Sequence, residues 1–227
     1  MVRDYLRGTP FFALIDILPS GDSLRSSSLL TVLGERWWDT THTFHWSWGE
    51  LTMTPEDIFA LTGLPFSGEI LVPNARRRIT PAGLRAVLGW LPGRIISDGI
   101  PHSVMLHHIE DEYERVRSGH EMTRQEVRQL TRCYLLLIFH DFFCARGGDN
   151  MRVWWLPYLR FLDRLYTHAW GGYVLAVLYE SMDLICRHME LNHRGFTTLW
   201  EVLFICNYRY VPLYCCMLIC DILFLLL

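Results

Sequence analysis

Lysine is absent from this chain, and all 21 side chains that count as Lys or Arg are arginines. The absence excludes enzymes that need a lysine amine, namely pyridoxal-phosphate enzymes that form a Schiff base, P-loop nucleotide hydrolases, protein kinases and Ser-Lys hydrolases. The seven cysteines form no Cys-x-x-Cys pair, and no cysteine pair stands at zinc-finger spacing from a histidine pair. The sequence therefore predicts no cofactor and no structural zinc.

Net charge is also small, with a formal value of -3 at pH 7. A chain of this charge has no general attraction for polyanions, so contact with nucleic acid would need a local basic patch, and protein partners are favoured instead. The N-terminus carries no signal-peptide pattern, and we therefore expect a reducing intracellular compartment.

Apolar residues, in contrast, are plentiful. Hydrophobic side chains make up 51% and aromatic side chains 14% of the 227 residues, enough for one sizeable core. No internal repeat divides the chain, so a single domain is expected over residues 5–201.

Residues 202–227 form an apolar C-terminal tail. The tail is almost long enough for a transmembrane helix, although Pro212 and Asp221 interrupt it. Three interpretations stay open: a membrane anchor, a buried terminal helix, and an extension that the core leaves exposed.

Cap signals and apolar periodicity predict a mainly α fold, a single helical domain. Thr54-Pro55 and Thr80-Pro81 each place a capping threonine before a proline at the first helical position. They predict short helices that end at Gly63, a left-handed terminator, and near Gly89. Further helices are predicted over residues 24–37, 103–117, 123–143 and 170–189, with a short one after residues 154–157.

The apolar period changes to two over residues 41–53, where threonine and aromatic residues of high β propensity flank Trp48-Gly49. This pattern predicts a small β-hairpin. Alternation along its first strand would create two faces, one with His42, Phe44 and Trp46 and the other with Thr43, His45 and Ser47. A further short strand is predicted over residues 69–72.

An ordered series of motifs occupies residues 35–65, and Trp170-Gly171 with residues 152–160 adds a second patch. Together they resemble the plant mobile domain family. In that family an Arg-containing helix end leads into a Thr-His-Thr-Phe-His strand, a Gly-Glu turn and a Thr-rich cap, followed by a helix closed by Gly-Leu-Pro. The residues that match the family motif are Arg36, Thr41, His42, Thr43, Phe44, His45, Gly49, Glu50, Asp57, Gly63, Leu64, Pro65, Trp170 and Gly171.

This resemblance implies a transposon-associated or transposon-derived plant protein, nuclear in its cellular forms and linked to meristem maintenance and to silencing of transposable elements. Some members carry the domain beside a serine/threonine phosphatase, and the domain is often called aminotransferase-like. Because a pyridoxal enzyme needs an internal amine, the lysine-free composition gives that label no chemical basis here. Thr40 stands where the family usually has glutamate, and the family domain is longer as a rule, so a truncated copy is expected.

Tryptophan and arginine supply the candidate interaction surface. Most tryptophans are expected in the core, but exposed Trp and Arg side chains are typical hot spots of protein interfaces. The predicted exposed anchors are Trp38, Trp48 and Trp154. A basic run that could contact phosphates or belong to a nuclear import signal, or else form a solvated loop, consists of Arg76, Arg77 and Arg78.

Histidines and acidic residues permit an enzymatic alternative. A metal-dependent hydrolase could use His42, His140 or Asp149 with acids from residues 110–114, provided that these side chains converge on one point. Each candidate also has a structural interpretation: opposite faces of a strand for His42 and His45, a solvated helical face for His107 and His108, the core or a helix edge for His140-Asp141, and a turn for Asp149.

The leading hypothesis is a non-catalytic nuclear adaptor that binds protein partners, among them a phosphatase-type protein or a nuclear silencing factor. Nucleic acid is a less supported partner, and a membrane enters only through the tail. The alternatives are the metal-dependent hydrolase and a tail-anchored membrane protein.

Overall fold

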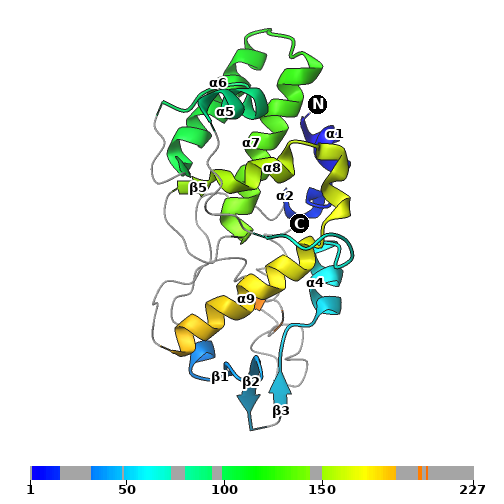
Figure 1. Ribbon diagram of the computed structural model, residues 1–227, viewed down its shortest axis with the longest axis vertical. Coiled ribbons are helices and arrows are strands. Elements are labelled where there is room, and N and C mark those ends of the chain that lie inside the picture. The colour runs from blue at the N-terminus through cyan, green and yellow to red at the C-terminus, as the bar shows by residue number, and fades with distance from the viewer. Residues whose placement is uncertain are drawn as a thin grey trace.

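The computed structural model describes residues 2–15, 32–47, 49–72, 80–93, 99–143, 150–187, 199–200 and 203. Figure 1 shows an elongated molecule in which helices fill the upper half and helix α9 crosses the lower half above a small sheet. The mainly α fold with a small β-hairpin is confirmed.

Helix α7 (Arg124–Phe143) is the centre of the upper half and contacts α1, α5, α6, α8, α9 and β5. Its second half is buried from Leu135 to Phe139, since a helix with neighbours on all sides must be apolar all round. The other elements of this half are α1 (Val2–Arg7), α2 (Phe12–Ile15), α5 (Pro81–Leu88), α6 (His102–Arg117), α8 (Leu156–Leu159), the antiparallel pair β4 (Gly99–Pro101) and β5 (Asn150–Arg152), and the 3₁₀ helices η1 (Val153–Trp155) and η2 (Leu162–Thr167).

Arg132 on α7 ties two of these helices together. Its guanidinium donates hydrogen bonds to the carbonyl oxygens of Val87 at 3.0 Å, Leu159 at 3.0 Å and Arg160 at 3.1 Å. These carbonyls lie at the C-terminal ends of α5 and α8, where helical amides leave them unsatisfied and the helix dipole is negative. One cation therefore caps both helix ends.

The lower half consists of α9 (Trp170–Cys186), α4 (Pro55–Thr62) and a three-stranded antiparallel sheet in the order β1-β2-β3. The strands are β1 (Trp37–Trp38), β2 (Thr43–Trp46) and β3 (Gly49–Leu51). Trp37 pairs with Phe44, and both side chains are buried, whereas Trp38 pairs with Thr43 on the other face. The predicted hairpin is β2-β3, and β1 adds a strand that the sequence did not predict.

The helix predicted over residues 24–37 is wrong at its C-terminal end. Trp37 lies in β1, because its indole packs against Phe44 (ring centroids 4.7 Å apart) and Trp200 (5.5 Å). Tertiary packing overrides the local apolar period here. The part of the prediction before residue 32 lies outside the described residues.

The strand predicted over residues 69–72 is also wrong. Among the described residues, the segment makes one isolated parallel bridge, between Glu69 and His168. The backbone of Val72 is engaged instead by the hydroxyl of Tyr158, which accepts from its amide at 3.3 Å and donates to its carbonyl at 3.0 Å.

Both cap-and-proline predictions are confirmed. The hydroxyl of Thr54 accepts the amide of Asp57 at 3.3 Å, and the carboxylate of Asp57 accepts the amide of Thr54 at 2.8 Å, which is a capping box. Gly63 and Gly89 end their helices with φ angles of 69° and 86°, a conformation that glycine adopts without strain.

Trp170 joins the two halves of the molecule. Its ring is fully buried and meets Phe11 and Phe139 with ring centroids 4.8 Å apart in both cases. Its indole N–H donates to the carbonyl oxygen of Leu165 at 2.6 Å, so the polar atom of the ring is also satisfied. Because Phe139 lies on α7 and Trp170 begins α9, this aromatic cluster fixes α9 to the upper half.

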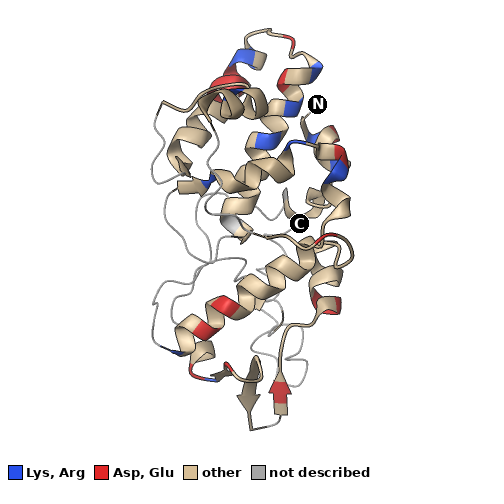
Figure 2. Cartoon of the chain, viewed as in Figure 1, with Lys and Arg blue, Asp and Glu red and all other residues tan. Residues whose placement is uncertain are grey.

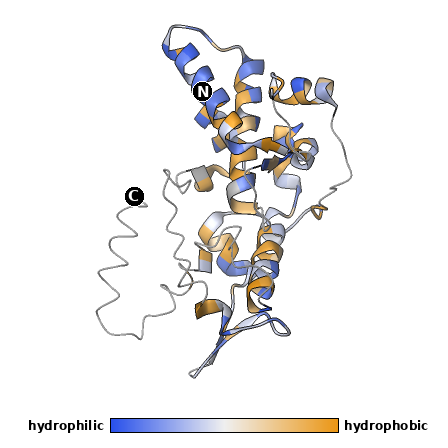
Figure 3. Cartoon of the chain, turned by 90° about the vertical axis from the view of Figure 1, so that its left-hand side faces the viewer, coloured by the Kyte–Doolittle hydropathy of each residue, from blue (hydrophilic) through white to orange (hydrophobic). Residues whose placement is uncertain are grey.

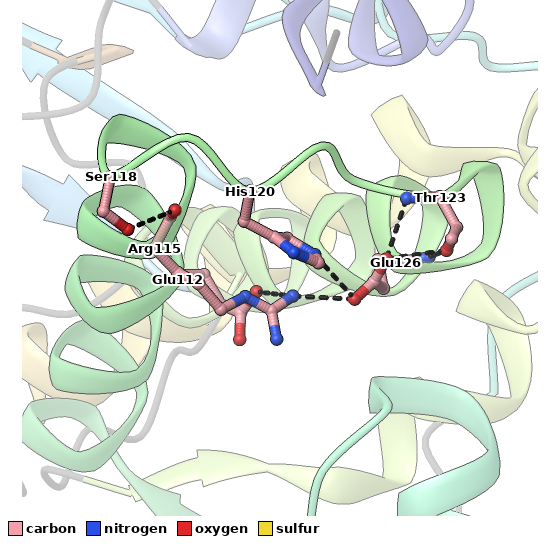
Figure 4. A network of polar contacts seen from close by, with 6 residues as sticks. All are labelled: Glu112, Arg115, Ser118, His120, Thr123 and Glu126. Atoms are coloured by element: carbon pink, nitrogen blue, oxygen red, sulfur yellow. Dashed lines mark hydrogen bonds and ion pairs between the residues drawn. The ribbon is translucent and has the colours of Figure 1, made fainter.

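The hydrophilic end of the molecule, where α6 and α7 meet, is stabilised by Glu126 (Figures 3 and 4). The amide and hydroxyl of Thr123 each donate to its carboxylate at 2.7 Å, and Arg115 donates at 2.7 Å. His120 lies 3.3 Å from the same carboxylate. These donors, the Thr123 amide first, lower the pKa of Glu126 to about 2.

Replacing Glu126 by glutamine is expected to lower the melting temperature at neutral pH and to reduce its acid dependence. Because the pKa of the folded state is about 2 against an ordinary 4.5, the carboxylate stabilises the fold above pH 4.5 and loses this effect as the pH falls toward 2. Thermal unfolding followed by circular dichroism over this range measures the effect, with the exposed Glu121→Gln as the control. A difference between Glu126→Gln and wild type that stays constant down to pH 2 would contradict the assignment.

Within the part of the chain that the structure describes, no helix is long and apolar enough to cross a membrane. Of the predicted tail, residues 202–227, only Leu203 is described, and it is buried. The tail-anchor hypothesis therefore stays a prediction.

Candidate functional site

The first motif patch, residues 35–65, contacts α9, the helix that begins with Trp170-Gly171 of the second patch. Asp183 on α9 accepts a hydrogen bond from the indole N–H of Trp37 at 2.7 Å, and its other carboxylate oxygen lies 3.2 Å from Nε2 of His42. The Asp183 side chain is 18% exposed and that of His42 is 40% exposed. A single carboxylate thus holds β1 and the turn that follows it against α9.

His42 has a left-handed backbone, with φ at 53°, which is uncommon for a residue other than glycine. Its carbonyl accepts from the hydroxyl of Thr52 at 2.6 Å, and its ring stacks on Tyr179 with centroids 5.0 Å apart. The predicted position in a strand is wrong, because His42 lies in the turn before β2.

Tyr179 completes what we call the motif cluster: Trp37, His42, Thr52, Tyr179 and Asp183. Its hydroxyl donates to the carbonyl of Met53 at 2.7 Å and accepts from Thr52 at 3.2 Å. Apart from the Thr52–His42 contact, which lies within the sheet and its turns, the polar contacts of the cluster link the sheet or its turns to α9. The cluster therefore positions these elements relative to one another.

The Gly-Leu-Pro and Trp-Gly motifs also contact each other. The amide of Gly171 donates to the carbonyl of Pro65 at 2.9 Å. A β-carbon at Gly171 would overlap the ring of Phe66, so only glycine allows the start of α9 to approach this closely.

Replacing Gly171 by alanine is expected to lower the free energy of unfolding by about 1–3 kcal/mol, the usual cost of overpacking. In a Phe66→Ala background the same change should cost far less, because the overlapping ring is gone. Urea denaturation of the four proteins measures both costs. Equal costs in the two backgrounds would show that Phe66 is not the cause.

The motif cluster is poorly suited to nucleophilic catalysis. Of the two carboxylate oxygens of Asp183, one is already engaged by the indole of Trp37, leaving the other for His42. Cys186 follows one turn further along α9, and burial raises the pKa of its thiol, which disfavours the reactive thiolate. In this arrangement the His42-Asp183 pair joins the turn to the helix.

The convergence that a metal-dependent hydrolase requires is not found among the described residues. No group of three or more His, Cys, Asp and Glu side chains within the described ranges could hold a metal ion. His42 lies beside α9, His140 lies on α7 near His102 (ring centroids 5.5 Å apart), and residues 110–114 lie on α6. Asp149 lies outside the described residues.

The prediction that His107 and His108 share a solvated face is wrong for His108. His107 is exposed, and its Nδ1 lies 2.7 Å from the carbonyl oxygen of Ser103. His108 stacks on Trp90, with ring centroids 4.0 Å apart, and burial lowers its pKa. Trp90 follows directly after α5, and its position over α6 cannot be read from the period of α6.

The solvent side of the sheet, which we call the outer sheet face, carries Trp38, Thr43, His45 and Glu50. Trp38 is 55% exposed and stacks on His45 with centroids 4.2 Å apart and ring planes 16° apart. Nε2 of His45 lies 3.1 Å from the Thr43 hydroxyl and 3.9 Å from the Glu50 carboxylate. His45 and His42 thus have separate sets of partners, and a large aromatic ring is held rigidly in solvent.

A pocket of about 290 Å³ opens beside Trp154. Trp154 itself is half-buried and packs against Trp155, with ring centroids 4.0 Å apart and ring planes tilted by 30°. Three further residues line the pocket and were not predicted: Tyr158, Phe161 and Arg164. The leucines at every third position from Leu156 to Leu165 mark the buried side of this segment, but they do not show what its other side faces. The remaining candidates, Trp48 and Arg76, Arg77 and Arg78, lie outside the described residues.

A larger, open depression of about 860 Å³ lies between α1, α7 and η2. Its polar side chains are paired with one another: Arg124 donates to the hydroxyl of Tyr5 at 2.9 Å, and Arg128 to the carboxylate of Asp163 at 3.3 Å. These contacts engage part of both guanidinium groups, whereas Nε of Arg128 is buried without a hydrogen-bond partner among the described residues. We take the smaller pocket, which borders exposed apolar side chains, as the binding candidate.

The fold is a helical domain in which the motif cluster holds a small sheet against one long helix, α9. The profile of the plant mobile domain matches residues 15–205, and the chain belongs to this family. No solved structure matches it.

Several proteins of Arabidopsis thaliana are similar to this chain. Protein MAIN-LIKE 2 is 32% identical over 155 residues, which are 68% of this chain and 22% of that protein. Protein MAINTENANCE OF MERISTEMS is 27% identical over 178 residues, 78% of this chain and 36% of that protein. Serine/threonine-protein phosphatase 7 long form homolog is 27% identical over 156 residues, 68% of this chain and 11% of that protein. The chain thus spans well under half the length of these relatives.

Proposed function

We propose that this chain is a non-catalytic interaction module that acts as an adaptor in plant nuclei. The observation that carries the proposal is the outer sheet face, where Trp38 is 55% exposed and stacked on His45. A rigid exposed tryptophan gives a large contact area with little loss of conformational entropy on binding, and it is a typical interface hot spot.

The non-catalytic part of the proposal is supported by how the family's signature residues are used. His42 and Gly171 are engaged in contacts between the sheet, the loop after α4 and α9. The thiol of Cys133 is fully buried, and burial raises its pKa to about 12, so it is no nucleophile at neutral pH. The absence of lysine removes Schiff-base chemistry.

The biological part of the proposal comes from the names of relatives. One relative is named for maintenance of meristems and another is a phosphatase homolog, and we extend both associations to this chain. We therefore propose a role in meristem maintenance, with a phosphatase-type protein as partner. A role in silencing of transposable elements, with a nuclear silencing factor as partner, is proposed from the family resemblance alone.

Affinity purification of the tagged chain from plant nuclear extract tests the proposal. Wild type is expected to recover a reproducible protein partner, and Trp38→Ser to lose most of it. Tyr113→Ser, which removes a 62% exposed aromatic ring from α6, is the matched control and should retain the partner. Recovery of no nuclear partner, or equal recovery with Trp38→Ser, would refute the proposal.

A further inference from the structure

Exposed apolar side chains occur in the two segments that border the pocket beside Trp154, and Val72 and Phe161 among them line it. The exposed fractions are 82% for Ile70, 65% for Val72, 48% for Phe161 and 54% for Tyr166. They come from two segments that lie side by side, because the amide of Glu69 donates to the carbonyl of Thr167 at 2.8 Å. Single exposed apolar residues are ordinary, but a group of them at the rim of a pocket indicates a binding surface.

Two arginines give this surface a positive rim. The guanidinium carbons of Arg160 and Arg164 lie 5.6 and 5.3 Å from the ring centre of Phe161, within the range of cation–π attraction. Neither arginine pairs with a carboxylate among the described residues, and both are exposed. They are therefore available to a carboxylate from outside the chain.

The acidic residues nearby offset this charge only in part. Asp163 is paired with Arg128 at 3.3 Å. Glu69 lines the pocket, and its carboxylate lies 3.8 Å from Nε2 of His168. In the lower half of the molecule, α4, α9 and β3 carry acidic rather than basic side chains (Figure 2). The two arginines are thus a local positive feature of a chain whose net charge is -3.

The pocket has a preformed wall and little open ring surface. The hydroxyl of Tyr158 is fixed to the backbone of Val72 on both its amide and its carbonyl, at 3.3 and 3.0 Å. Trp154 already packs against Trp155 with the ring planes tilted by 30°, and two guanidinium groups already lie near the ring of Phe161. Stacking of nucleic-acid bases needs open aromatic faces, so a peptide fits this surface better than a single-stranded nucleic acid.

We infer that this pocket binds an acidic peptide segment of a partner protein, with one apolar side chain in the pocket and carboxylates on Arg160 and Arg164. The inference deepens the proposed interaction role and rests on it. Arginine and exposed aromatic rings are the usual hot-spot residues of such sites, and guanidinium groups bind carboxylates with two parallel hydrogen bonds.

Fluorescence anisotropy with three labelled probes tests the inference on the full chain. The probes are a short peptide with a Leu-Phe pair flanked by glutamates, the same peptide with lysines in place of the glutamates, and a single-stranded oligothymidylate. The glutamate peptide is expected to bind at least about tenfold more tightly than the lysine peptide, because two ion pairs replace two repulsions.

Variants then assign the binding to this surface. Arg164→Gln should weaken binding of the glutamate peptide by about threefold to fivefold and Arg160→Gln by a similar factor, whereas Glu69→Gln should strengthen it by about twofold. Arg117→Gln, which removes an arginine whose side chain is 72% exposed on α6, is the matched control and should bind like wild type. Phe161→Ser should weaken binding by about tenfold, with Tyr113→Ser as its control.

Equal or tighter binding of the lysine peptide or the oligothymidylate would overturn the inference, as would binding that is insensitive to Arg160 and Arg164. Concentration-dependent self-association that Phe161→Ser abolishes would assign the surface to a second copy of this chain and overturn it too. The proposed function fails separately, when no nuclear partner is recovered or when Trp38→Ser recovers as much as wild type. If the chain recovers a nuclear partner that depends on Trp38 but does not bind the glutamate peptide, the inference about this pocket is refuted and the proposed function stands.

Discussion

Replacing Trp170 by alanine is expected to lower the free energy of unfolding by about 3–5 kcal/mol, the range for deleting a buried aromatic ring. The ring is fully buried, contacts Phe11 and Phe139, and donates to the carbonyl of Leu165 at 2.6 Å. Because a typical domain is stable by only about 5–15 kcal/mol, this single change should remove a large part of the total. Chemical denaturation followed by circular dichroism measures it.

Trp170→Phe is the matched variant for this prediction. It keeps an aromatic ring but removes the N–H, which leaves the carbonyl of Leu165 without its donor from this ring. We expect a smaller loss, about 1–3 kcal/mol. An alanine variant as stable as wild type would show that the aromatic cluster does not join the two halves of the molecule.

Replacing Asp183 by alanine is expected to lower the free energy of unfolding by about 2–4 kcal/mol. The change leaves the indole N–H of the buried Trp37 without an acceptor and removes the partner of His42. Asp183→Asn keeps an oxygen that can accept from Trp37, so its cost should be less than about 1.5 kcal/mol. Thermal unfolding of the two variants compares them directly.

The comparison separates two roles of this carboxylate. If Asp183 serves as a hydrogen-bond acceptor that holds the sheet, the asparagine variant should stay close to wild type. An asparagine variant as damaged as the alanine variant would mean that the negative charge itself is needed, which is contrary to the structural role assigned to the motif cluster.

Local signals explain which parts of the fold could be predicted. Thr54-Pro55 and Thr80-Pro81 act through hydrogen bonds and φ angles within one helical turn, so both helix starts can be read directly from the sequence. The same holds for the left-handed glycines that end these helices. The β2-β3 hairpin follows from alternation over a few residues.

Contacts between distant residues explain the errors. Trp37 has the local period of a helix but pairs in β1, because Phe44 and Trp200 supply its packing. His108 is covered by Trp90, which follows a different helix. The local pattern around Trp37 does not reveal its contact with Trp200, and the local pattern around His108 does not reveal its contact with Trp90.

The candidate surfaces were predicted only in part. Trp38 is 55% exposed because alternation in β1, a strand that the sequence did not predict, turns it away from the buried Trp37. The pocket beside Trp154 was missed because Glu69 and His168 bring its two segments together through one isolated bridge. A bridge of a single residue pair leaves no periodic trace in the sequence.

Our main claim is that the motif cluster holds the fold together, whereas the outer sheet face binds the partner. Recovery of the partner by two folded variants tests this claim most directly. His42→Asn removes the imidazole but suits the left-handed backbone, since asparagine tolerates this conformation. Purified from plant nuclear extract beside wild type, His42→Asn is predicted to retain the partner and Trp38→Ser to lose it. A folded His42→Asn protein that loses the partner, beside a Trp38→Ser protein that keeps it, would contradict the claim.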